Sequence, residues 1–113
     1  MLVVQVINFN LSGMGELEYK QTCDTLAGSF AEVSGLLAKY WLSDSADNTF
    51  GGVYLWEDRT SLEHFTRSEL FNTVATHPNL VNMSSKVFDI LEGPTRVTRG
   101  FEVVNAIKQA RAV

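Results

Sequence analysis

Apolar and polar positions follow two periods along the chain, one typical of strands and one typical of helices. Val and Ile dominate residues 2–10, which predicts a strand. Over residues 16–33 the apolar positions recur at intervals of four and three, as on one buried face of a helix. Gly35 is expected to cap the end of this helix. The predicted buried face consists of Tyr19, Cys23, Leu26, Phe30 and Val33.

Two aromatic-rich segments then predict a hairpin of strands over residues 36–43 and 49–56, joined by a polar turn at 44–48. A second helix is expected to open near Asp58, because Thr60 and Glu63 have the spacing of a capping box. A further helical segment is expected from Ser68, and Pro78 should stop it.

A last strand is predicted over residues 79–91, after which Gly93 and Pro94 break the pattern. Residues 95–100 are expected to be extended. Residues 101–112 predict a short helix that turns three apolar side chains inward, namely Val103, Val104 and Ile107.

This order of elements predicts a ferredoxin-like α+β fold, βαββαβ, with a four-stranded antiparallel sheet and helices on one face. One domain should span residues 1–113, with about 93–113 as a C-terminal arm. Residues 3–9 are apolar at both odd and even positions, so the second sheet face also needs a cover. We expect a homodimer that packs two sheets back to back, with the arm lying across the partner subunit.

Charge and cysteine content narrow the possible partners and the compartment. The formal net charge is −4 and the nine basic residues are scattered, which argues against nucleic-acid binding. The apolar start of the chain is too short for a signal peptide or a membrane span, so we expect no membrane association. The single cysteine, Cys23, suits a reducing environment and predicts a cytoplasmic protein.

The hairpin carries the candidate chemistry. Lys39 is the only cation of its strand and lies two residues before Trp41, on the same strand face. It could be a cation in an apolar pocket, or an edge-strand lysine that reaches water. Trp41, Tyr54 and Trp56 could line a cavity for an aromatic ligand, or could be ordinary core residues.

Few polar residues outside the hairpin are candidates for substrate binding or catalysis. Asn8 lies late in the first strand, where an amide is unusual. His64 lies beside Phe65 on the second helix and could act as a base, or could be a half-exposed helical residue. His64 and His77 are the only histidines, and their spacing to other ligand types does not indicate a metal site.

Three motifs resemble the YdhR-like monooxygenase family: Gly-Leu-x-x-Lys-x-Trp at 35–41, Gly-Gly-x-Tyr-Leu-Trp at 51–56, and Lys-Val-Phe-Asp at 86–89. This family belongs to the dimeric α+β barrel superfamily and is related to the antibiotic-biosynthesis monooxygenases. The resemblance implies a homodimer with a pocket between sheet and helices in each subunit. It also implies oxidation of small aromatic or polyketide-like substrates without metal or organic cofactor.

The resemblance favours a pocket position for Lys39, which would then stabilise a substrate anion. An isomerase or cyclase, or a non-catalytic protein that binds an apolar small molecule, remains an alternative on the same scaffold. Haem binding is not expected, because Ala75 stands where haem-degrading relatives carry their histidine. The candidate catalytic residues are Lys39, Tyr54 and His64, and the candidate substrate-binding residues are Asn8, Trp41, Trp56, Phe65 and Lys86.

Overall fold

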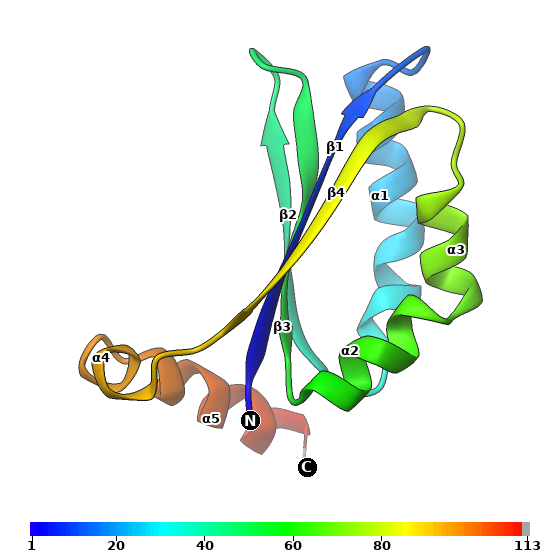
Figure 1. The fold of residues 1–113 in the computed structure, drawn as a ribbon. Helices are drawn as coiled ribbons and strands as arrows, with labels where there is room; N and C mark the ends of the chain where they lie inside the picture. The colour runs from blue at the N-terminus through cyan, green and yellow to red at the C-terminus, as the bar shows by residue number, and fades with distance from the viewer. Residues whose placement is uncertain (112–113) are drawn as a thin grey trace.

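The computed structural model describes residues 1–111 and confirms the predicted βαββαβ order. Figure 1 shows a single antiparallel sheet with helices covering one face and the C-terminal helices lying at its end. The strands are β1 (Val3–Leu11), β2 (Leu36–Asp44), β3 (Thr49–Trp56) and β4 (Leu80–Asp89), in the spatial order β2-β3-β1-β4. The helices are α1 (Glu16–Ala31), α2 (Arg59–Thr66), α3 (Glu69–Ala75), α4 (Glu92–Val97) and α5 (Gly100–Arg111).

Strand register decides which side chains share the helix-covered face. Lys39 pairs with Tyr54 and Trp41 pairs with Gly52, so the hairpin's lysine and aromatics point to the same side. Tyr54 in turn pairs with Gln5 on β1. This inner face is buried along β1 at alternate positions: Val3, Gln5, Ile7 and Phe9.

The open face of the sheet is largely apolar as well. Tyr40 opposes Val53, which in turn opposes Val6 on β1. Tyr40 is 62% exposed and Phe88 on β4 is exposed too. The described residues therefore leave uncovered the same second face that the sequence marks as apolar. Its members are Val4, Val6, Asn8, Ala38, Tyr40, Leu42, Gly51, Val53, Leu55, Ser84, Lys86 and Phe88.

The helix boundaries follow local capping chemistry, with two corrections to the predictions. The capping box at Thr60 is wrong: the N-cap of α2 is Asp58, whose carboxylate accepts the Ser61 backbone N–H at 2.8 Å. Gly35 is not the cap of α1, whose last residue is Ala31 and whose C-cap is Glu32. Gly35 instead has a φ of 82° in the turn to β2, where a side chain would collide with Ser61.

Ser68 caps α3, as expected from its position, by accepting the Phe71 backbone N–H at 3.2 Å. α3 contains no fully buried side chain. Three half-buried ones, Leu70, Phe71 and Val74, pack against the core instead.

The described part of the C-terminal arm consists of the helices α4 and α5, joined by a turn at Thr98 and Arg99. The expected extended segment at 95–100 is wrong because Pro94 lies in the first turn of α4, where a backbone N–H has no partner to lose. Val104 is buried on α5, but Val103 is 52% exposed. Neighbouring residues of a helix point about 100° apart, so the two valines cannot both face inward.

α5 contacts β2 of its own subunit, and Arg111 donates a hydrogen bond to the Leu36 carbonyl at 2.6 Å. Position 112, the expected last residue of this helix, lies outside the described residues. That the arm crosses a partner subunit stays a prediction. None of the helices within residues 1–111 is long and apolar enough to cross a membrane.

Candidate active site

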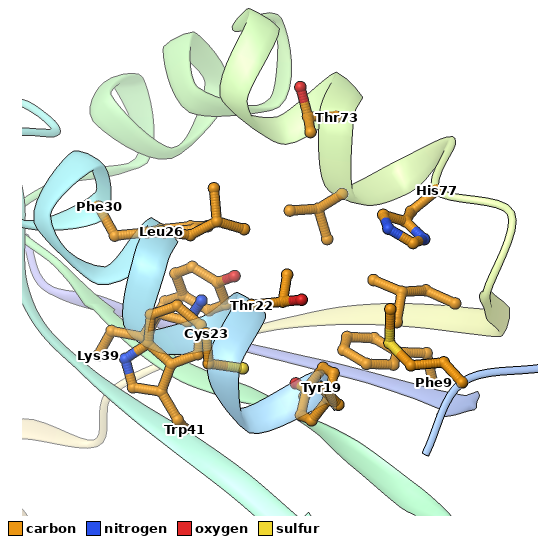
Figure 2. A pocket seen from close by; sticks show the side chains of 15 residues that line it. Phe9, Tyr19, Thr22, Cys23, Leu26, Phe30, Lys39, Trp41, Thr73 and His77 are labelled. Carbon is orange, nitrogen blue, oxygen red and sulfur yellow. The ribbon is translucent and has the colours of Figure 1, made fainter. Parts of the chain in front are cut away.

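A small cavity lies between the inner face of the sheet and the helices α1 and α3. Its volume is about 40 Å³, which is room for only a few water molecules. In Figure 2, Lys39 and Trp41 reach it from β2, side chains of α1 such as Cys23 and Phe30 lie beside them, and Thr73 lies across from α1. Its lining is predominantly apolar. A bicyclic aromatic therefore fits only after part of the wall moves outward.

Lys39 is the one cation among the described residues that line this cavity. Its Nζ lies 3.3 Å from the ring centroid of Trp41, 3.5 Å from that of Phe30 and 4.6 Å from that of Tyr54. Three ring faces attract an ammonium group through their quadrupoles. No carboxylate within residues 1–111 pairs with it.

Gly52 makes room for this arrangement. It stands opposite Trp41 on β3, and a Cβ at this position would come within 2.8 Å of the Lys39 Cε. The missing side chain lets the lysine stem cross over the strand and reach the aromatic rings. The Gly-Gly pair of the hairpin motif thus has a structural role beside the cavity.

Burial sets the protonation of the site. It lowers the pKa of Lys39 to about 7, while the nearby Cys23 acts weakly in the opposite direction. Burial also raises the pKa of Cys23 and of Tyr54, which keeps the thiol and the phenol protonated. Near neutral pH the Lys39 amine can therefore readily exchange a proton.

Tyr54 is held rigidly. It is only 3% exposed, and its ring stacks parallel to Trp56 with centroids 6.0 Å apart. Phe65 packs against it at 5.5 Å. Tyr54 lines the cavity, and the described residues include no hydrogen-bond partner for its hydroxyl. The hydroxyl can therefore orient a ligand without first breaking a contact.

The remaining sequence-predicted site residues lie elsewhere. Trp56 and Phe65 are core residues that support Tyr54 from behind, and Trp56 is 0% exposed. Asn8 lies on the open face of the sheet, because it has the opposite parity to the buried positions of β1, and Lys86 lies there because it pairs with Val6 of that face. His64 is exposed on α2. The structure brings together Lys39, Trp41 and Tyr54 but does not bring Trp56, Phe65, Asn8, Lys86 or His64 to the cavity.

Several lining residues were expected only to form the core. Phe30 and Cys23 belong to the predicted buried face of α1, and the cavity uses that same face. His77 also lines the cavity; it lies just beyond α3, and its Nδ1 accepts the Asn79 backbone N–H at 3.1 Å. The helical period identified this face, but only tertiary packing shows that it meets Lys39. Within the described chain no three His, Cys, Asp or Glu side chains gather in a way that could hold a metal ion.

The lowered pKa of Lys39 predicts a pH dependence of stability. In the unfolded chain Lys39 keeps its usual pKa near ~10.4, so between about pH 7 and 10 the unfolded state holds a proton that the folded state has lost. The free energy of unfolding should therefore gain a positive slope with pH in this range. Urea titrations at several pH values measure the free energy of unfolding of wild type and of Lys39→Met. The difference between these two free energies should change between about pH 7 and 10. Parallel profiles would contradict the buried placement of the amine.

The comparisons with known proteins agree with this architecture. The crystal structure of SnoaB, a cofactor-independent oxygenase from Streptomyces nogalater, has a TM-score of 0.66 at 17% identity, over 80% of this chain and 94% of that one. Rv0793 from Mycobacterium tuberculosis has a TM-score of 0.67 at 13% identity, over 81% and 97%. At these identities the likeness shows the fold alone. No curated protein matches the chain.

The family comparison is more specific. The family described as "Putative mono-oxygenase ydhR" matches residues 4–101. The match begins in β1 and reaches the start of α5, so it includes every strand and the whole cavity. The chain therefore belongs to the YdhR family of mono-oxygenases.

Proposed function

We propose that the protein oxidises a small aromatic or polyketide-like phenol with O₂, without a bound cofactor. Membership of a mono-oxygenase family supports the reaction type. The likeness to SnoaB, a cofactor-independent oxygenase, supports the absence of a cofactor. The single observation that carries the proposal is the half-buried Lys39 side chain, whose amine is caged by aromatic rings beside a largely apolar cavity.

The substrate itself supplies the electrons in this reaction. Loss of a proton from an activated carbon gives an anion, which passes an electron to O₂, and the two radicals combine as a peroxide. Breaking the O–O bond leaves one oxygen atom as a carbonyl on that carbon. The second oxygen leaves as water with two hydrogens, one of them from the same carbon, so a CH₂ and O₂ give C=O and H₂O.

Each residue of the cavity has a role that follows from its chemistry. The Lys39 ammonium stabilises the substrate anion in a site of low dielectric, where such an interaction is strong. The Tyr54 hydroxyl donates a hydrogen bond that orients the substrate oxygen. Trp41 and Phe30 offer ring faces and edges to the aromatic substrate.

One observation favours the isomerase or cyclase alternative. With its pKa lowered to about 7, the Lys39 amine is a competent general base at neutral pH. Such an enzyme would move protons without consuming oxygen. A non-catalytic binding protein would do neither.

Oxygen uptake separates these functions. The purified protein is mixed with a series of mono- and polycyclic phenols in an oxygen-electrode cell, and products are weighed after reaction under ¹⁸O₂. The proposal expects stoichiometric uptake and one ¹⁸O atom in the product. Product formation without uptake would support the isomerase, and binding without product would support the binding protein.

We also propose that the open sheet face packs against a second copy of this chain. Val53 lies in the middle of that face, between Tyr40 and Val6. Val53→Glu should weaken dimerisation by about 100-fold or more, because an unpaired buried carboxylate costs several kcal/mol. Sedimentation at micromolar concentration measures this. Leu17→Glu, on the exposed surface of α1, is the matched control and should leave the assembly unchanged. A monomeric wild type would contradict the proposal.

A cytoplasmic location is proposed as well. Cys23 is a free thiol, half-buried against the cavity, which fits a reducing compartment.

A further inference from the structure

We propose that Lys39 is also a covalent binding site for apolar carbonyl compounds, aldehydes or ketones, which its amine captures as an imine. This activity differs from the oxygenation proposed above and does not depend on it. It uses the same side chain, but it needs neither oxygen nor a substrate anion.

The first argument is access. A groove of about 410 Å³ runs outside the cavity, between α1, β2 and α5. Phe30, Lys39 and Trp41 line both the groove and the cavity, so the lysine belongs to the wall that separates them. A ligand too large for the inner cavity can therefore approach the amine from the groove. The floor and sides of the groove are apolar, with Ala27, Ala31, Ala38 and Ile107 among them.

The second argument is the set of charged and titratable groups that face the amine. Tyr19 and Cys23 approach from α1 and Tyr54 from β3, while His77 lies across the cavity and Arg111 borders the groove. None of them is a carboxylate. The exposed lysines Lys20 and Lys108, by contrast, pair with glutamates. Without an acidic partner, the buried Lys39 amine can lose its proton and expose its lone pair.

The third argument is the product. The amine nitrogen adds to the carbonyl carbon, and the carbonyl π electrons move to oxygen. The oxygen then leaves as water with the two hydrogens of the amine, which gives a C=N bond. No oxidant or reductant is required. The neutral imine removes a charge from an apolar site, and an aromatic carbonyl compound gains contact with Trp41 and Phe30.

Reductive trapping tests the proposal on the full chain. The protein is incubated with benzaldehyde and sodium cyanoborohydride at neutral pH without oxygen, and the benzylated peptides are quantified by mass spectrometry. At this pH a usual lysine is only about 0.1% unprotonated, so we expect Lys39 to be labelled at least about tenfold more than the other lysines. These internal references are Lys20, Lys86 and Lys108.

The α-amino group of Met1 provides a further reference, because Met1 is exposed and lies outside the lining of the cavity and the groove. Labelling of Lys39 above that of Met1 shows that the pocket, and not basicity alone, directs the reaction. In urea the preference for Lys39 should disappear. Lys39→Met should lose the pocket adduct, and Lys20→Met should keep it.

Equal labelling of Lys39 and the exposed lysines in the folded protein would overturn the proposal, as would a preference that persists in urea. The test runs without oxygen, so its result is independent of oxygenation. A trapped adduct without phenol oxidation would contradict only the function proposed above. Phenol oxidation without an adduct would contradict only this inference.

Discussion

Lys39→Met should lower the turnover of a phenolic substrate with O₂ by about 100-fold or more, because one preorganised group that stabilises an anion is worth that much in many enzymes. Methionine has a similar unbranched shape and can fill the aromatic cage. The fold should therefore persist while the charge is lost. Oxygen uptake at saturating substrate measures turnover, and thermal unfolding confirms that the variant is folded.

Two further variants make this result interpretable. Lys39→Arg keeps a positive charge and should retain part of the turnover, although its planar head fits the three rings differently. Lys20→Met changes an exposed lysine on α1 and should behave as wild type. A folded Lys39→Met variant with full turnover would mean that the amine does not stabilise the reacting anion.

Trp56→Ala should reduce the free energy of unfolding by about 3–5 kcal/mol, as large-to-small changes of buried aromatics do. Trp56 is fully buried and packs against Tyr54 and Phe65. Its indole N–H also donates to the Gln5 side-chain oxygen at 3.0 Å, while the Gln5 amide donates to Ser85 at 3.1 Å. Urea unfolding followed by circular dichroism measures the loss.

Trp56→Phe separates the packing from the hydrogen bond. It keeps an aromatic ring but leaves the buried Gln5 oxygen without its donor, which should cost about 1–3 kcal/mol. Its active-site geometry should be less affected than that of Trp56→Ala, since phenylalanine can still support Tyr54. If Trp56→Ala cost less than about 1 kcal/mol, the placement of this ring in the core would be wrong.

The elements of the fold could be predicted from the sequence because their hydrophobic periods are clear. The stripe on α1 places Tyr19 and Phe30 on the buried face of that helix. Where a pattern was ambiguous, the sequence did not specify the orientation. Val4 and Val6 are as apolar as Val3 and Ile7, so parity alone could not show which side of β1 meets the helices.

The candidate site was predictable in part for the same reason. Lys39, Trp41 and Tyr54 share a face through strand register, which no local pattern in the sequence specifies. Asn8 has the wrong parity for the cavity, and His64 lies off the inward side of α2, which Leu62 and Phe65 define. The contact of Phe30 with Lys39 joins a helix to a strand and required the tertiary structure.

The small buried contact of α3 with the rest of the domain has a consequence for catalysis. Segments held by few buried contacts open locally at a much lower free energy than the whole domain needs to unfold. α3 supplies Thr73 and Val74 to the wall of the cavity, yet none of its side chains is fully buried. We therefore expect local opening of this seven-residue helix to admit a bulky substrate, while the sheet that carries Lys39 stays in place.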